Sequence, residues 1–276
     1  GHPDMTSKFP FFATDGHRRG IREQEGRSFM SVKGGRAMLE SLQRCKQAAR
    51  DLLTHLDFER FYREISIRIP LMASQNISLV LDVGANIGQF ASRIRRQGYT
   101  GRIVSFEPLA KEFAQLQENA ADDPGWECRH TALGSFNGTG EINRAGNSYS
   151  SSLLPMLERH IAHAPDSAYV GKEEISIARL DSLAEEIIRK DDRVYLKIDT
   201  QGYEMEVLKG SGNILGQVVL IELELTVVPL YENQVLHAEM AEHLNRLGYD
   251  LVWAEKGFSV PKTGEVLQFD GIFLRR

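Results

Sequence analysis

Apolar and polar residues follow one pattern at the beginning of the chain and another along the remainder. Before Gly35, the residues Gly, Arg and Ser and isolated aromatic residues follow no sustained period, which predicts an irregular arm. From Ala37 to about Arg63, apolar residues recur at helical spacing, which predicts one or two amphipathic helices. We therefore predict an N-terminal arm and helical cap over residues 1–65 and a main domain over residues 66–276. The helical cap is also a candidate surface for a homodimer.

In the predicted main domain, short apolar runs alternate with amphipathic segments. Continuous runs of Val, Ile and Leu are typical of parallel strands that are buried on both faces. The predicted strands are 79–83, 102–106, 128–133, 194–198, 218–225, 249–254 and 266–274, the last two being a candidate antiparallel pair. The predicted helices are 89–96, 111–120, 181–190, a short helix ending at 209, and 239–247. This alternation predicts a doubly wound, Rossmann-like α/β sheet.

A polar segment rich in Gly, Asn and Ser covers residues 134–152. Residues of these types favour turns, so the segment predicts a hairpin or a long loop. Its tip, 147–152, has hydroxyl and amide groups that could close over a bound cofactor and acceptor. The alternative is a polar hairpin tip with no such role.

The first predicted strand ends in the sequence Asp82-Val83-Gly84-Ala85-Asn86-Ile87-Gly88. In a doubly wound sheet this turn lies where ligands bind, and its glycines allow close approach of the backbone. The spacing differs from the G-x-G-x-x-G pattern of dinucleotide sites, which favours S-adenosylmethionine as the cofactor. Glu107, at the end of the second strand, is placed to accept hydrogen bonds from the ribose hydroxyls. Asp82, Gly84, Asn86, Gly88 and Glu107 are therefore candidate cofactor-binding residues.

The charge and the cysteine content of the chain argue against several other classes of function. The 33 basic residues are outnumbered by 38 acidic residues and are scattered, which argues against binding to nucleic acid. The two cysteines form neither a disulfide framework nor a zinc pattern. No apolar run approaches the length of a membrane span, and no signal-peptide pattern is present, so we expect a cytoplasmic location.

Six motifs in order resemble the FkbM family of methyltransferases, over about residues 79–274. They are Leu81 to Gly88, Phe106-Glu107-Pro108, Ala132-Leu133-Gly134, Leu180-Asp181-Ser182-Leu183, Lys197-Ile198-Asp199-Thr200-Gln201-Gly202-Tyr203-Glu204, and Ile221-Glu222. The resemblance implies a class I methyltransferase fold and O-methylation of hydroxyls on sugars, polyketide-type natural products or related glycoconjugates. With it, Pro108 and Ala132 join the candidate cofactor-binding residues, and Ser151, from the tip 147–152, is a further candidate.

Methyl transfer to an alcohol requires removal of a proton from a group with a very high pKa. Asp199 and Glu222 lie toward the carboxyl ends of two predicted strands and are candidate catalytic residues. Asp270 interrupts an apolar run, and the three carboxylates are candidate ligands for Mg²⁺. The alternatives are a helix cap for Asp199, a buried ion pair with Lys197 for Glu222, and a metal-free scheme with either carboxylate as general base.

Three histidines, at positions 130, 160 and 163, are further candidate bases, with a structural or surface role as the alternative for each. The function that the sequence favours is S-adenosylmethionine-dependent O-methylation (EC 2.1.1.-) of a sugar or saccharide-containing metabolite. A polyketide-type acceptor, an NAD(P)-dependent oxidoreductase and a non-catalytic cofactor-binding module are the alternatives.

Overall fold

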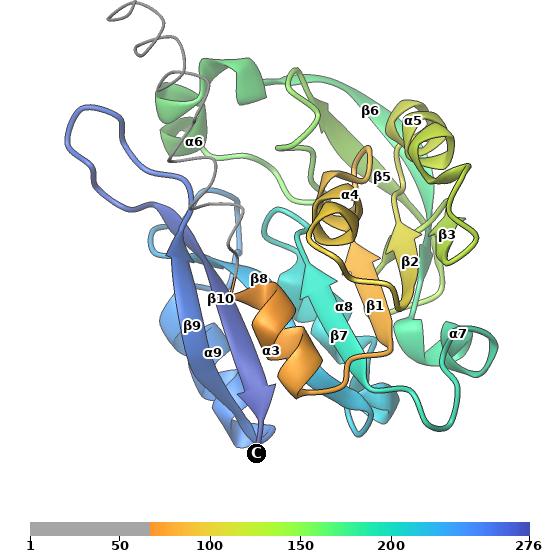
Figure 1. Cartoon of the computed structure of the whole chain (residues 1–276). Coiled ribbons are helices and arrows are strands. Elements are labelled where there is room, and N and C mark those ends of the chain that lie inside the picture. Colours follow the sequence, from red (N-terminus) through yellow and green to blue (C-terminus); the bar gives the residue numbers. More distant parts are fainter. Residues whose placement is uncertain (1–66) are drawn as a thin grey trace, which may run out of the picture. The chain divides into compact units, whose positions relative to one another are not determined.

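A single sheet of seven strands forms the centre of the computed structural model, which describes residues 67–276. Its order is β3 (Trp126–Arg129), β2 (Arg102–Phe106), β1 (Leu79–Val83), β7 (Val194–Ile198), β8 (Val218–Thr226), β10 (Gln268–Arg275) and β9 (Tyr249–Lys256). The first five strands are parallel, and β10 runs antiparallel between β8 and β9 (Figure 1). The doubly wound sheet and the closing antiparallel pair are thus confirmed.

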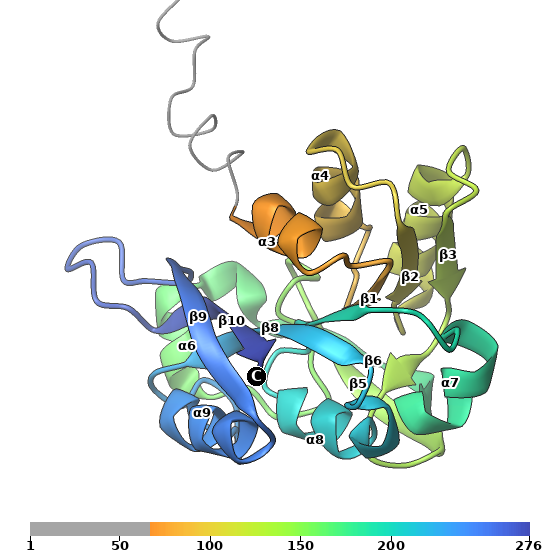
Figure 2. The ribbon, with the colours of Figure 1, turned by 60° about the horizontal axis from the view of Figure 1, so that its bottom comes forward.

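Helices cover both faces of this sheet (Figure 2). On one face lie α3 (Arg68–Ser74), α4 (Gln89–Arg96) and α5 (Ala110–Ala120), and on the other α7 (Leu180–Ile187), α8 (Glu204–Lys209) and α9 (His237–Arg246). The shorter α6 (Glu158–His163) and two 3₁₀ turns, Pro165–Ser167 and Gly212–Ile214, lie in connecting segments. Among residues 67–276, no helix has the length and apolar character needed to cross a membrane.

Alternate residues of the buried strands enter two separate apolar cores, as the two-residue period of a strand requires. On β1, Leu79, Leu81 and Val83 pack with residues of α7, α8 and α9. Val80 points to the other face and packs with residues of α3, α4 and α5. Burial of both faces explains why these strands are almost purely apolar.

A second, three-stranded sheet departs from the prediction. The predicted strand 128–133 is wrong, because its residues divide between β3 in the main sheet and β4 (Ala132–Leu133) in the second one. The segment predicted as a hairpin or long loop contains β5 (Gly138–Ala145), which pairs with β6 (Tyr169–Ala178), a strand that was not predicted. The order of this sheet is β4-β6-β5.

The N-terminal predictions fall outside the described residues. The arm and helical cap over residues 1–65, and the homodimer surface assigned to the cap, remain predictions.

Candidate active site

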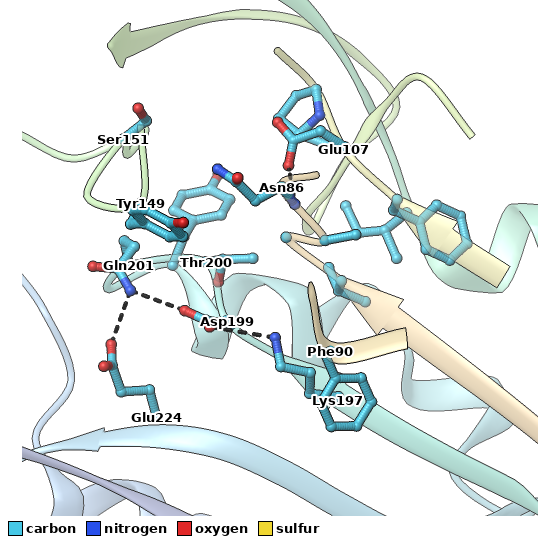
Figure 3. A pocket seen from close by; sticks show the side chains of 18 of the residues that line it. Asn86, Phe90, Glu107, Tyr149, Ser151, Lys197, Asp199, Thr200, Gln201 and Glu224 are labelled. Carbon is cyan, nitrogen blue, oxygen red and sulfur yellow. Dashed lines mark hydrogen bonds and ion pairs between the residues drawn. The ribbon is translucent and has the colours of Figure 1, made fainter. Parts of the chain in front are cut away.

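The carboxyl ends of the central parallel strands open into a cavity of about 370 Å³. Strand order reverses between β1 and β7, which is where ligands bind in open α/β sheets. The predicted site residues lining this cavity are Gly84, Asn86, Glu107, Pro108, Ala132, Ser151, Asp199, Glu222 and Asp270. Figure 3 shows Asn86 and Glu107 at one end of the cavity, hereafter the Glu107 end, and Asp199, Gln201 and Glu224 at the other, the Asp199 end.

Two glycines shape the turn after β1. A Cβ on Gly84 would lie 1.9 Å from the carbonyl oxygen of Asp199, and its φ is +75°. Gly84 therefore permits the close approach of the ends of β1 and β7. A Cβ on Gly88 would lie 2.7 Å from the ring of Trp126, at a φ of +86°. Gly88 does not line the cavity, and its contacts show a role in the packing at the start of α4. Its predicted contact with the cofactor stays a prediction.

Glu107 provides a buried carboxylate at the wall of the cavity. Its Oε2 accepts a hydrogen bond from the backbone N–H of Asn86 at 2.8 Å, and its Oε1 accepts one from that of Leu109 at 2.9 Å. Burial raises the pKa of Glu107 to about 7, although both backbone N–H groups act to lower it. A carboxylate can accept about four hydrogen bonds, so each oxygen keeps capacity for a ligand hydroxyl.

The tip predicted to close over a ligand contacts the turn after β1. The Nδ2 of Asn86 donates to the Oγ of Ser148 at 3.2 Å, and the Nε2 of Gln89 donates to the hydroxyl of Tyr149 at 3.3 Å. Ser151 accepts a hydrogen bond from the N–H of Ala145 at 3.0 Å. The tip thus forms part of the cavity wall between its two ends.

Asp82 lies beneath the cavity and not in its wall. Its side chain is fully buried, its Oδ2 accepts a hydrogen bond from Ser105 at 3.2 Å, and its Oδ1 is 3.5 Å from the Nζ of Lys197. Burial raises the pKa of Asp82. The geometry therefore favours an action of Asp82 through Lys197 rather than the direct cofactor contact that was predicted.

Lys197 supplies a positive charge at the base of the Asp199 end. Its Nζ lies 3.3 Å from the Oδ2 of Asp199 and 5.3 Å from the centroid of the Phe90 ring. Burial alone would lower the pKa of Lys197, but the charges of Asp199 and Asp82 raise it above its ordinary value. The charged form of the lysine is therefore favoured, and its Nζ lies between the acidic side chains of Asp199 and Asp82.

Asp199 is the accessible carboxylate of the site. Its side chain is 41% exposed, and its Oδ1 accepts a hydrogen bond from the Nε2 of Gln201 at 2.9 Å. The helix-cap alternative is wrong, because α8 begins at Glu204 and its N-cap residue is Tyr203. The carboxylate of Asp199 is therefore available to a molecule bound in the cavity.

Glu222 has a different environment from the one predicted. Its partner is Arg68 and not Lys197: the Nε of Arg68 donates to both carboxylate oxygens at 2.9 Å. The hydroxyl of Tyr195 donates to Oε2 as well, and the Glu222 side chain is only 4% exposed. The pairing matches the general expectation that a buried charge must be compensated. A carboxylate held in this way is poorly suited to act as a general base or a metal ligand.

The predicted magnesium site has no support in the geometry. Within residues 67–276, no group of three or more His, Cys, Asp or Glu side chains is placed to hold a metal ion. Asp270 does line the cavity, and burial, with the charges of Glu222 and Asp199, raises its pKa to about 7. The three proposed ligands thus share one cavity without forming a coordination shell.

Sequence reasoning did not single out Gln201, Glu224 or Arg68. The Nε2 of Gln201 donates to both Asp199 and Glu224, and burial, with the charges of Asp199, Asp270 and Glu204, raises the pKa of Glu224 well above its ordinary value. A signal for Glu224 existed, because it interrupts an apolar strand two residues after Glu222 and so lies on the same face. Arg68 is 154 positions from Glu222, and no local pattern indicates their pairing.

The three candidate histidines do not line the cavity. The Nε2 of His130 lies 3.0 Å from the carbonyl oxygen of Pro108, and its ring stacks on Phe113. His160 is buried, with its ring 5.2 Å from that of Tyr231, and burial lowers its pKa. These contacts fit the structural alternative and leave the carboxylates as the candidate bases.

Comparison with known proteins assigns the chain to a family. Residues 82–251 match the family described as Methyltransferase FkbM domain. The chain is 27% identical to hexuronic acid methyltransferase AglP of Haloferax volcanii, over 67% of this chain and 72% of that protein. It is 26% identical to methyltransferase sdnD of Sordaria araneosa, over 66% of this chain and 79% of that protein.

A solved structure of methyltransferase FkbM from Methylobacillus flagellatus is also similar, with a TM-score of 0.41 and 13% identity. The similarity covers 71% of this chain but 43% of that one, so this chain spans less than half of the solved protein. The match of the family model extends over more than half of the present chain and includes the turn after β1 and the carboxyl ends of β2, β7 and β8. On this ground the protein is a methyltransferase that belongs to the FkbM family.

Proposed function

We propose that this methyltransferase transfers a methyl group from S-adenosylmethionine to a hydroxyl of a sugar or saccharide-containing metabolite. The observation that carries the proposal is a cavity with a buried carboxylate at the Glu107 end and an accessible carboxylate at the Asp199 end. The first suits a ribose and the second suits removal of a hydroxyl proton. Both ends belong to one continuous space, as transfer between two bound molecules requires.

The Glu107 end is the proposed cofactor half. Glu107 would accept hydrogen bonds from the ribose hydroxyls with the lone pairs that Asn86 and Leu109 leave open. Gly84 and Asn86 line the cavity, and Pro108 and Ala132 line it as well, while Ser151 belongs to the tip between the two ends. When bound, S-adenosylmethionine supplies an electrophilic methyl group on a positively charged sulfur.

The Asp199 end is the proposed acceptor half. Asp199 would take the proton of the acceptor hydroxyl while the new oxygen–methyl bond forms and the sulfur–methyl bond breaks. The carboxylate is accessible, and Lys197 and Gln201 hold its two oxygens from below and from the side. Because the charges of Glu222 and Arg68 are already paired, the proposal assigns the proton transfer to Asp199 and uses no metal.

The acceptor half contains acidic and basic side chains. Asp199, Glu224 and Asp270 line the same cavity as Lys197, Arg68 and Arg93, and burial raises the pKa of Glu224 and of Asp270. A relative acts on a hexuronic acid, which bears a carboxylate of its own. Neutral sugars and their uronates are therefore both candidate acceptors.

The test is methyl transfer from isotope-labelled S-adenosylmethionine to a panel of acceptors, with the site of methylation determined by mass spectrometry and NMR. The panel pairs each neutral glycoside with its uronate and includes polyketide-type alcohols. We expect labelled methyl ethers of saccharides from the wild type, and a loss of turnover of about 100-fold or more in Asp199→Asn. EDTA should leave the wild-type rate unchanged.

Each alternative has its own result in the same assay. Labelling of polyketide alcohols alone would replace the saccharide by the other acceptor class. Cofactor binding without turnover of any hydroxylated compound would favour the non-catalytic module. Loss of activity with EDTA and recovery with Mg²⁺ would contradict the metal-free scheme. The family assignment already decides against the oxidoreductase.

A further inference from the structure

Gln201 connects two carboxylates of the acceptor half through one side-chain amide (Figure 3). Its Nε2 donates one hydrogen bond to the Oδ1 of Asp199 at 2.9 Å and another to the Oε2 of Glu224 at 3.0 Å. An amide nitrogen has two hydrogens, so both are used by these contacts. The amide therefore lies between two acids that would otherwise face each other.

The orientation of this amide is determined by its partners. The nitrogen of Gln201 faces Asp199 and Glu224, and an ionised Asp199 carboxylate can only accept a hydrogen bond. The hydroxyl of Tyr231 lies 2.9 Å from the Oε1 of Gln201 and 3.1 Å from the carbonyl oxygen of Ser150, and it can donate its proton to either. The opposite orientation would place the amide oxygen against two carboxylate oxygens.

The backbone around Gln201 is also held on both sides. The Oγ of Ser152 donates to the carbonyl oxygen of Gln201 at 2.7 Å. The Oε1 of Glu204 accepts hydrogen bonds from the N–H groups of Thr200 and Gly202, at 3.1 and 3.0 Å. Gln201 adopts a φ of +54°, a conformation that such contacts must sustain in a residue with a side chain. Its amide is thus presented to the acids from a fixed backbone.

We propose that Gln201 is a positioning residue that holds the Asp199 carboxylate in its ionised form and in a fixed orientation at the acceptor half. A hydrogen bond donated to an ionised carboxylate favours that form. Gln201 donates such a bond to Asp199, and the same amide nitrogen lies between Asp199 and Glu224. The catalytic consequence rests on the proposed function, but the effect on ionisation does not.

The other groups that act on Asp199 remain in every variant considered below. The charged and titratable groups around it, from β1, β7, β8, β10, α8 and the loop before α9, are Asp82, Lys197, Glu224, Asp270, Glu204 and Tyr231. A difference between wild type and variant therefore reports on Gln201.

The direct test is an NMR titration of the Asp199 side-chain carboxyl carbon, assigned with Asp199→Asn. In Gln201→Met, which keeps the length of the side chain and removes the amide, we expect the titration midpoint to rise by about one pH unit. Gln268→Met is the matched control, because the Nε2 of Gln268 donates to Glu224 at 2.6 Å and has no contact with Asp199. Its Asp199 midpoint should equal that of the wild type.

The kinetic test uses the acceptor that the wild type methylates. Gln201→Met and Gln201→Glu should lower kcat by about 10- to 100-fold and move the acidic limb of the kcat profile to higher pH, with the KM for S-adenosylmethionine within about twofold. Gln268→Met should leave the position of the limb unchanged. An equal loss of kcat at every pH would overturn the positioning role.

The inference about Gln201 and the proposed function can each be rejected without the other. An Asp199 midpoint that is the same in wild type and Gln201→Met would overturn the inference, whatever the turnover. A raised midpoint in a protein that methylates no hydroxyl would support the inference on ionisation and reject the proposed function. If Gln201→Met does not fold, Gln201→Glu serves as the second variant, because it retains the shape of the side chain.

Discussion

Arg68 and Glu222 form an ion pair that is buried on both sides. Their side chains are 3% and 4% exposed, and Arg68 also pairs with Glu255 at 3.1 Å and lies over the ring of Trp253. A buried pair contributes little more than an apolar pair of the same shape, but loss of one partner leaves an uncompensated buried charge. The pair therefore has a large effect on the free energy of unfolding only when one of its two partners is removed.

Arg68→Met should lower the free energy of unfolding by about 3–5 kcal/mol. The double variant Arg68→Met, Glu222→Gln should recover a large part of this loss, because the unpaired charge is gone. Urea denaturation of the three proteins measures both effects. Arg246→Met is the control: its pair with Glu242 is exposed, and we expect a loss below about 1 kcal/mol. An equally small loss in Arg68→Met would show that Glu222 does not depend on Arg68.

Gly84 and Gly98 allow a backbone effect to be separated from a steric one. Both have positive φ, +75° and +100°, but only at Gly84 would a Cβ meet another atom, the Asp199 carbonyl oxygen at 1.9 Å. Gly98→Ala should cost about 1–2 kcal/mol of unfolding free energy, from the left-handed conformation alone. Gly84→Ala should cost more and should also weaken binding of S-adenosylmethionine, because β1 and β7 must move apart. Equal costs in urea denaturation would argue against the close approach.

The individual site residues were only partly predictable from the sequence. Glu107 and Asn86 follow buried strands at a known turn, so their place in the cavity could be inferred from order along the chain. Glu222 could not be judged in this way, since its environment is decided by Arg68, 154 positions away. Asp82 was placed correctly on its strand, but only the packing of Lys197 reveals that it lies beneath the cavity.

At the scale of elements, predictability followed burial. The strands of the main sheet that are buried on both faces give long apolar runs, and their predicted bounds agree closely with the structure. The strands β5 and β6 have one exposed face and the polar sequences GTGEINRA and YVGKEEISIA. Their few apolar residues, Ile142, Ile175 and Ile177, pack with Leu109 and Ala132, contacts that no local pattern displays.

The loop between β7 and α8 depends on the buried carboxylate of Glu204. Burial raises the pKa of Glu204 from 4.5 to about 7, although it accepts hydrogen bonds from backbone N–H groups. An acid whose pKa is raised in the folded state retains a proton that the unfolded chain has lost. Between pH 4.5 and about 7 this group therefore makes the protein less stable as the pH rises, by up to about 3 kcal/mol.

Glu204→Gln should remove this dependence. The free energy of unfolding of the wild type should fall relative to that of the variant as the pH increases from 5 to 7, and the difference should level off above pH 7. Glu206→Gln is the control on the same helix: although burial acts to raise the pKa of Glu206, its hydrogen bonds to Lys209 and Ser135 lower it. Glu206 thus titrates below this range. Parallel curves for wild type and Glu204→Gln would contradict the account.

At the scale of the described domain, topology brings the two halves of the site together. The chain passes from β1 outward to β3 and returns to β7, so that residues of the turn after β1 and of the loop after β7 meet although about 115 positions separate them. The second sheet and the tip at Ser148–Ser151 close the cavity between these halves. A substitution at the Glu107 end can therefore leave the Asp199 end unchanged, because the two ends come from segments that are far apart in the sequence.

The most direct measurement of the central claim, a cavity that holds S-adenosylmethionine at its Glu107 end, is calorimetric titration of the cofactor into matched variants. Glu107→Ala should weaken binding by about 10-fold or more, because both ribose hydroxyls lose a charged acceptor. Glu173→Ala is the control, since Glu173 also accepts a backbone N–H, from Ala110 at 2.8 Å, but lies outside the cavity; its affinity should match that of the wild type. Unchanged affinity in Glu107→Ala would contradict the account.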